Sequence, residues 1–253
     1  MRKLFFLLSI LFFGCDSNNP ESQNHPAKKD SVSRPIIVAH KDSLSEKIET
    51  VTDLEKQLLD AGLVNVHELD STIKIDLRYS TTENFVGMDV YGNFDKCFLQ
   101  PDVAAKLVKA QKLLKEKYPF YSLVVFDAVR PLHIQRKMWD TLVLPPGQKA
   151  KYLSNPNNGS LHNYGAAVDL GIIDDNGIYL DMGTPFDFFG EKAHPEKEQE
   201  LLASGELTER QVLNREILRS VMRQAGFFGI QTEWWHFNSC RRETAAEIYK
   251  IVE

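Results

Sequence analysis

The chain has 253 residues and a mass of 28.9 kDa, enough for one sizeable domain or at most two small ones. Its hydrophobic share of 43% and charged share of 26% exclude a chain disordered throughout, a collagen-like repeat and a disulfide miniprotein. Thirty basic against 35 acidic residues leave a net charge of −5, so we expect no nucleic-acid partner. No apolar run reaches the ~18 residues that a membrane-spanning helix requires.

Residues 1–14 have the pattern of an export signal. Two basic residues precede the apolar stretch 4–13, which is too short to span a bilayer. Gly14 and Cys15 follow at once, and this ending resembles a bacterial lipoprotein signal, in which the cysteine is acylated and becomes the new N-terminus. A plain signal peptide with a chance cysteine is the alternative. We therefore expect an exported protein of the cell envelope, on its periplasmic face, held to a membrane only by lipid on Cys15.

A polar segment follows the expected lipidation site. Residues 16–50 contain no aromatic side chain and are rich in Ser, Asn, Pro, Lys and Asp. Such a composition buries too little apolar surface to offset the entropy lost on ordering. We therefore expect residues 15–50 to be a flexible tether and residues 51–253 to form a single folded domain.

Two cysteines lie in the expected domain, Cys97 and Cys240. They could pair in an oxidising compartment, or each could be buried alone, and the sequence leaves both alternatives open.

The first half of the domain mixes helical and extended patterns. Residues 53–61 predict a short helix, and the period-two alternation of residues 73–77 predicts a strand. Pro101 is typical of a first helical turn, and apolar residues at helical spacing follow it as far as Pro119. The apolar run 122–126 predicts a central strand, which is followed by another helix.

The second half continues in the same way. Residues 166–173 predict a strand, and residues 174–207, rich in Gly, Asp and charge, predict long loops over one face. Thr208 and Gln211 have the spacing of a capping box, which opens a helix that ends at Gly226. Strands and helices do not alternate regularly. The pattern therefore favours an α+β domain with a small antiparallel sheet and flanking helices.

Two segments place an imidazole beside a carboxylate. His162 and Asp169 flank a glycine turn that leads into a strand, and Glu233 lies three residues before His236. A catalytic zinc uses three nitrogen or oxygen ligands and leaves one position for water. His162, Asp169 and His236 supply three such ligands. Glu233 then remains as a base for that water, and Arg130, at the end of a predicted strand, could stabilise an oxyanion.

These residues also match a known family. The pattern Ser-x-His-x-x-Gly-x-Ala-x-Asp at 160–169, with Glu-x-Trp-His at 233–236, resembles the zinc D-Ala-D-Ala metallopeptidases, and most of all their VanX-type D-alanyl-D-alanine dipeptidases. The resemblance runs from about residue 69 to 237. It implies the hedgehog/DD-peptidase fold and one Zn²⁺ per chain. The residues that it implies are the zinc ligands His162, Asp169 and His236, the base Glu233, the transition-state arginine Arg130, and the substrate contacts Tyr79, Ser160 and Asp187.

The resemblance implies hydrolysis of the D-Ala-D-Ala dipeptide to two D-alanines. An exported enzyme cannot reach a cytosolic pool, so we expect cell-wall dipeptide salvage or turnover rather than antibiotic resistance. One alternative is a zinc carboxypeptidase or endopeptidase that acts on longer wall peptides. Another is a lipoprotein that binds wall fragments or zinc without catalysis, although such a protein needs neither Glu233 nor Arg130. The sequence does not predict the oligomeric state.

Overall fold

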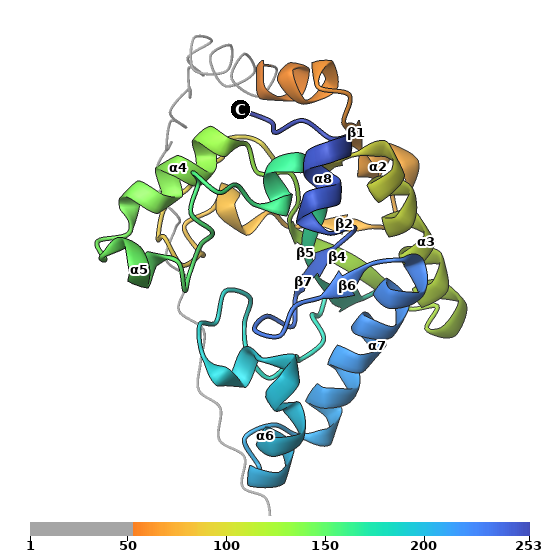
Figure 1. The fold of residues 1–253 in the computed structure, drawn as a ribbon. Coiled ribbons are helices and arrows are strands. Elements are labelled where there is room, and N and C mark those ends of the chain that lie inside the picture. The colour runs from red at the N-terminus through yellow and green to blue at the C-terminus, as the bar shows by residue number, and fades with distance from the viewer. Residues whose placement is uncertain (1–52) are drawn as a thin grey trace, which may run out of the picture. The chain divides into compact units, whose positions relative to one another are not determined.

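A five-stranded sheet organises residues 53–253, the part of the chain that the computed structural model describes (Figure 1). The expected signal segment 1–14 and the whole of the expected tether 15–50, including the lipidation site Cys15, lie outside the described residues. The strand order is β2-β4-β5-β7-β6. The strands are β2 (Lys74–Ile75), β4 (Tyr121–Asp127), β5 (Ala167–Asp174), β7 (His236–Asn238) and β6 (Phe228–Gly229).

The sheet is mixed, which corrects the prediction of an antiparallel one. The pairs β4–β5, β5–β7 and β6–β7 are antiparallel, but β2 runs parallel to β4. Parallel pairing requires a long crossover connection. Residues 76–120, which contain helix α3 (Pro101–Lys117), supply that connection. The α+β class itself is confirmed, and so are the two central strands predicted over 122–126 and 166–173.

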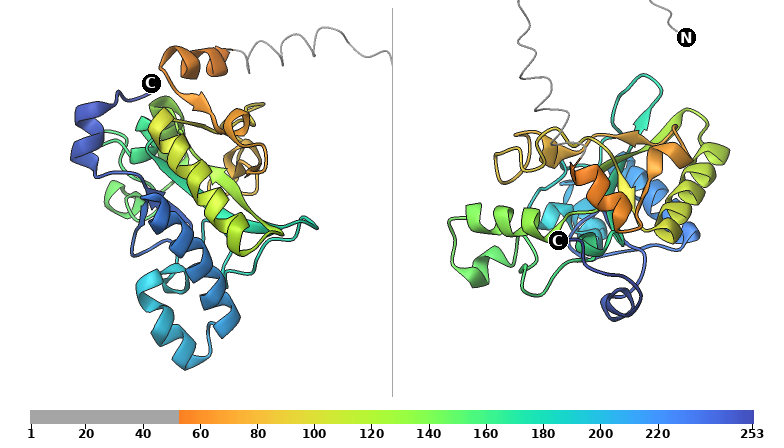
Figure 2. Two further views of the ribbon diagram at one scale, coloured as in Figure 1. Left: turned by 90° about the vertical axis from the view of Figure 1, so that its right-hand side faces the viewer. Right: turned by 90° about the horizontal axis from the view of Figure 1, so that it is seen from above.

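Long helices pack beside this sheet. Helices α3 and α7 (Glu209–Ala225) contact each other and lie on the same side of the sheet (Figure 2). The predicted capping box is present, because the Thr208 hydroxyl accepts from the backbone of Gln211 at 3.3 Å and the Gln211 side chain accepts from the Thr208 backbone at 2.9 Å. Gly226, with φ of 101°, ends the helix in the left-handed conformation that favours glycine.

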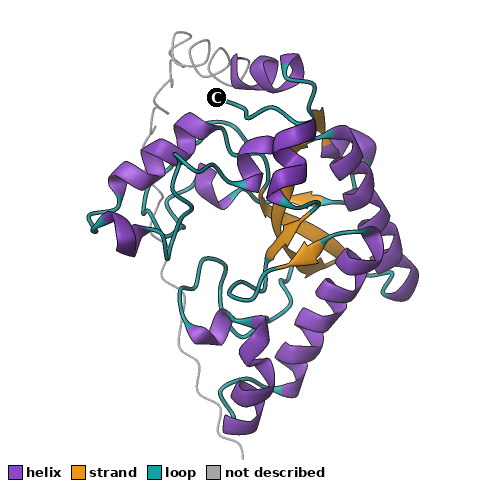
Figure 3. Ribbon diagram, viewed as in Figure 1, coloured by secondary structure: helices purple, strands orange, loops and turns teal. Residues whose placement is uncertain are grey.

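Short elements complete the domain, and Figure 3 shows them between stretches of loop. Residues 53–60 are helical, as predicted. The remaining elements are β1 (Val64–Asn65), α2 (Val66–Leu69), η1 (Arg78–Ser80), β3 (Phe98–Leu99), α4 (Leu132–Thr141), α5 (Pro146–Lys149), η2 (Leu161–Tyr164), η3 (Glu191–Ala193), η4 (Pro195–Lys197), α6 (Glu198–Ser204) and α8 (Arg242–Ile248). Within residues 53–253, no helix is both long and apolar enough to cross a bilayer.

The predicted loop region 174–207 is only partly loop. It contains α6, which buries Leu201 and ends at Gly205, a residue with φ of 78°. Because this stretch is rich in charged residues, its sequence did not indicate the short apolar face that holds the helix in place. Cys97 is buried and Cys240 is half-buried, and both are free thiols, so the alternative of two separate cysteines holds.

Candidate active site

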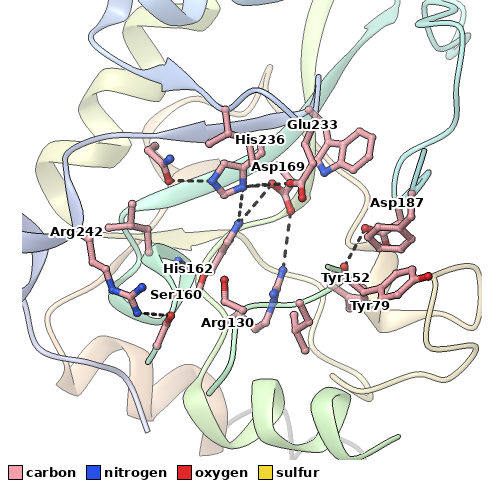
Figure 4. Close-up of a pocket in the computed structure, with 18 residues that line it drawn as sticks. Tyr79, Arg130, Tyr152, Ser160, His162, Asp169, Asp187, Glu233, His236 and Arg242 are labelled. Carbon is pink, nitrogen blue, oxygen red and sulfur yellow. Dashed lines mark hydrogen bonds and ion pairs between the residues drawn. The ribbon is translucent and has the colours of Figure 1, made fainter. Parts of the chain in front are cut away.

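The three predicted metal ligands come together at one end of the sheet (Figure 4). Asp169 on β5 lies directly opposite His236 on β7 in the antiparallel register, and His162 enters from η2. Asp169 Oδ1 is 2.9 Å from His236 Nδ1 and 3.4 Å from His162 Nε2. The two imidazole nitrogens are 3.3 Å apart. Three ligand atoms from separate segments therefore converge on one point.

Neighbouring groups orient both imidazoles for metal binding. Nδ1 of His162 lies 2.7 Å from the carbonyl oxygen of Ala128, which leaves Nε2 to face the cluster. Nε2 of His236 lies 2.8 Å from Oδ1 of Asn238, which leaves Nδ1 to do the same. Metal-binding histidines characteristically donate their other N–H to such a partner. Two imidazole nitrogens and one carboxylate oxygen fit the ligand set of a catalytic zinc.

The turn that carries His162 is held by local capping. Ser160 caps η2, and the side chain of Asn163 accepts from the Ser160 backbone at 2.6 Å. Gly165 ends the turn with φ of 64°, and a Cβ there would collide with Leu63, so this position requires glycine. The motif's serine and glycine thus build the turn that aims the histidine.

Arg130 follows β4 and is buried, with 5% of its side chain exposed. Its Nε and Nη2 groups both donate to Oδ2 of Asp127, and the guanidinium carbon lies 5.0 Å from the centre of the Tyr79 ring. Nη2 lies 3.9 Å from Oδ2 of Asp169. Burial lowers the pKa of Arg130, but the carboxylate of Asp127 together with Tyr79, Tyr91 and Asp169 outweighs burial and raises the pKa well above its usual value. A permanent cation therefore points at the ligand cluster.

Glu233 lies beside the cluster without being one of the three converging ligands. Its Oε2 is 3.9 Å from His236 Nδ1, and 29% of its side chain is exposed. Burial raises the pKa of this carboxyl above its usual range. A carboxylate with a raised pKa, next to a metal site, is suited to accept a proton and release it again.

The far side of the pocket holds a buried acid, Asp187. The hydroxyl of Tyr79 donates to Oδ1 of Asp187 at 3.1 Å, whereas the buried Oδ2 of Asp187 has no hydrogen-bond partner within residues 53–253. Burial, and then the negative charge of Asp169, raise the pKa of Asp187 well above its usual range. The backbone of Asp187 is left-handed, with φ of 60°, a strained conformation for this residue. Such an acid is free to pair with a cationic ligand.

One cavity of about 260 Å³ brings all of the predicted site residues of the domain together. Its lining includes Tyr79, Arg130, Ser160, His162, Asp169, Asp187, Glu233 and His236. Trp235 also lines it, and Trp234 is buried beside it.

The buried metal ligands shift one another's pKa values. Burial lowers the pKa of His236, but Asp169 raises it to about 9. Burial raises the pKa of Asp169, but the two histidines hold it well below its usual value.

Several functional candidates were not predicted from the sequence. They are Asp127, Tyr152, Phe189, Asn238 and Arg242. A signal existed for two of them. Asn238 is two residues after His236 and therefore on the same face of a strand, and Asp127 is three residues before Arg130. The others reach the site only through the packing of distant loops and helices.

Comparisons with known proteins agree with this geometry. The family described as Peptidase_M15, D-ala-D-ala dipeptidase, matches residues 59–252. A D-alanyl-D-alanine dipeptidase of Escherichia coli is 31% identical over 69% of this chain and 83% of that protein. One from Enterococcus faecium is 27% identical over 71% of this chain and 92% of that protein.

Among solved structures, the LdcB LD-carboxypeptidase is similar at 19% identity, with a TM-score of 0.31, over 62% of this chain and 83% of that one. This likeness is too distant to inform the fold or the function. The family match spans almost all of the described domain and contains every residue of the converging ligand cluster. The chain therefore belongs to the M15 peptidase family of zinc-dependent D-Ala-D-Ala dipeptidases and is a metallopeptidase.

Proposed function

We propose that this enzyme hydrolyses the dipeptide D-Ala-D-Ala to two D-alanines. The observation that carries the proposal is the convergence of His162, Asp169 and His236 beside Glu233, inside a cavity of about 260 Å³. This volume lies just below the ~300–1,000 Å³ typical of pockets for drug-sized ligands, which favours a small substrate. The names of the E. coli and E. faecium relatives, both D-alanyl-D-alanine dipeptidases, support the same substrate.

In the proposed mechanism, each residue has a separate task. Zn²⁺ held by His162, Asp169 and His236 would supply a Lewis acid and lower the pKa of its water to about 7. Glu233 accepts a proton from the attacking water and delivers it to the nitrogen of the leaving D-alanine. The fixed guanidinium of Arg130 stabilises the oxyanion that forms on the scissile carbonyl. Its ion pair with Asp127 holds it in place before the substrate arrives.

The ammonium group of the substrate fits the opposite side of the cavity. The unpartnered Oδ2 of Asp187 accepts from the ammonium, while Tyr79 holds the other carboxylate oxygen. A longer peptide without a free ammonium at this position would leave the Asp187 carboxylate buried and unpaired. The cost of an unpaired buried group is the way in which a buried polar site rejects the wrong substrate.

A second candidate function has the same chemistry but acts on a longer substrate. A groove of about 530 Å³ adjoins the cavity and shares Tyr152, Phe189 and Glu233 with it. This groove offers room for a longer wall peptide, as a zinc carboxypeptidase or endopeptidase would need.

Hydrolysis assays with the purified protein distinguish these candidates. The substrates are D-Ala-D-Ala, L-Ala-L-Ala and a pentapeptide stem that ends in D-Ala-D-Ala, each with and without a chelator. We expect rapid, chelator-sensitive cleavage of D-Ala-D-Ala and little cleavage of the other two. Faster release of D-alanine from the pentapeptide would instead support the second candidate, and no cleavage of any substrate by the zinc-loaded protein would refute both.

We also propose that the enzyme is an exported lipoprotein that acts in dipeptide salvage. The support is the ending at Cys15, which follows a short apolar stretch with two basic residues before it. Cys15→Ser should move the protein from the membrane fraction to the soluble fraction of cells. Retention of the variant in the membrane fraction would contradict the anchor.

A further inference from the structure

We propose that Arg242 binds the C-terminal carboxylate of the dipeptide and thereby sets the direction in which the substrate lies. The inference rests on the proposed function, because it assigns the remaining charged end of that substrate. Arg242 is the first residue of α8, and its side chain lines the same cavity as the metal cluster.

The cavity has opposite charges at its two ends. Figure 4 shows Asp187 and Tyr79 on one side of the metal cluster and Arg242 with Ser160 on the other. A dipeptide is a zwitterion, with its ammonium and its carboxylate on either side of the scissile bond. An ammonium at Asp187 and a carboxylate at Arg242 would place that bond between them, beside the cluster and Glu233.

Local structure holds the Arg242 guanidinium over the turn that leads to His162. Its Nη2 donates to the carbonyl oxygen of Gly159 at 2.6 Å, and α8 packs against η2. Gly159 has φ of 71°, a left-handed conformation that favours glycine, although a Cβ would make only an ordinary contact 3.7 Å from Nη2 of Arg242. The hydrogen bond to Gly159 therefore holds the guanidinium close to the loop backbone, next to Ser160.

The two arginines of the cavity differ in how their charge is used. Arg130 is paired with Asp127, whereas Arg242 has no carboxylate within 4.0 Å among residues 53–253. A guanidinium carries five N–H donors, and the described hydrogen bond to Gly159 uses one of them. Paired N–H groups of arginine match the two oxygens of a carboxylate. Arg242 is thus the cation of this cavity that is available for a ligand anion.

The test compares a substrate that has the carboxylate with one that lacks it. D-Ala-D-Ala and its C-terminal amide have the same scissile bond, so only the acid can form the ion pair. Arg242→Gln keeps an N–H donor for Gly159 but removes the charge. A charge-assisted hydrogen bond contributes enough that we expect kcat/KM for the acid to fall about tenfold to a hundredfold, mainly through KM. For the amide we expect a change below about threefold.

Two further variants separate binding from structure. Arg242→Lys retains the charge but not the paired donors, so kcat/KM for the acid should lie between the wild type and Arg242→Gln. Arg241→Gln removes the neighbouring exposed cation, which does not line the cavity. It should leave kcat/KM for both substrates unchanged. If Arg242→Gln lowers kcat/KM equally for the acid and the amide, the proposal is overturned, and the role of Arg242 is to support the turn that leads to His162. If the wild type cleaves neither substrate, the proposed function fails instead.

Discussion

Asn238 accepts a hydrogen bond from His236, two residues before it on β7, with 2.8 Å between Nε2 and Oδ1. This contact leaves Nδ1 of His236 to face the metal cluster. Asn238→Ala removes the acceptor, and loss of such a partner typically lowers metal affinity ~10–100-fold. We expect a loss of this size in zinc competition with a chromophoric chelator. Asn238→Asp keeps an acceptor oxygen and should retain most of the affinity. Equal affinity in the wild type and Asn238→Ala would show that the contact does not orient the ligand.

Glu233 can be separated from metal binding by a single substitution. Glu233→Gln keeps the size of the side chain but cannot accept a proton. General base catalysis typically contributes ~10²–10⁴-fold, so kcat on D-Ala-D-Ala should fall within that range. Metal analysis should still find one zinc per chain, because the three converging ligands remain. Full activity in the zinc-loaded variant would refute the role of Glu233 as the base.

We expect Asp187 to bind the substrate but to lower the free energy of unfolding of the protein. Asp187→Asn tolerates the left-handed backbone but carries no charge. Without that charge, kcat/KM on D-Ala-D-Ala should fall about tenfold or more, since charge-assisted hydrogen bonds contribute ~1.5–3 kcal/mol. The free energy of unfolding should rise at neutral pH, because the substitution removes a buried charge whose Oδ2 has no partner within residues 53–253.

The difference in the free energy of unfolding between the wild type and Asp187→Asn should depend on pH. Burial raises the pKa of Asp187 in the folded chain above its unfolded value. Below the unfolded pKa the carboxyl is neutral in both states and causes no penalty. As pH rises from the unfolded pKa to the raised folded pKa, folding of the wild type is increasingly disfavoured relative to Asp187→Asn, and above the folded pKa the difference stays constant. Denaturant unfolding of both proteins from pH 4 to 8 measures this, and a constant difference would contradict a raised pKa.

Gly183 lies in the segment that leads to Asp187, and it has φ of 83°. A Cβ at this position would collide with the side chain of Leu207. Gly183→Ala should therefore lower the free energy of unfolding by about 1–3 kcal/mol, through strain and overpacking. Gly177 has a similar φ of 80° but no atom near the position of a Cβ. Gly177→Ala is thus the matched control, and it should cost about 1 kcal/mol from backbone strain alone. Equal losses in the two variants would show that Leu207 adjusts freely.

Spacing along the chain accounts for the parts of the site that lie in continuous segments, whereas the substrate contacts Tyr79, Ser160 and Asp187 were expected only from the resemblance to the family. His162 and Asp169 belong to one turn that runs into one strand, so their spacing already places them on neighbouring elements. The long strands and α7 were also predictable, because their apolar periods and caps are local. The parallel pairing of β2 was not, since a strand of two residues has too little pattern to indicate its partner.

The remaining site residues depend on contacts between distant segments. β7 has three residues and no clear alternation, so the register that sets His236 opposite Asp169 could not be read from its sequence. Arg242 begins a helix in an ordinary charged stretch. It reaches the cavity only because α8 packs against η2, more than seventy residues earlier in the chain.

Phe189 lines both the cavity and the adjoining groove and lies where they meet. Its ring centre lies 4.7 Å from that of Tyr152 and 5.0 Å from that of Phe85, so rings from three loops meet at this border. Phe189→Ala removes the central ring and should open the cavity to longer peptides. We expect the ratio of kcat/KM on D-Ala-D-Ala-D-Ala to that on D-Ala-D-Ala to rise severalfold. Phe188→Ala is the matched control, because Phe188 lines the groove but not the cavity. An unchanged ratio in Phe189→Ala, or the same rise in both variants, would show that this ring does not limit substrate length.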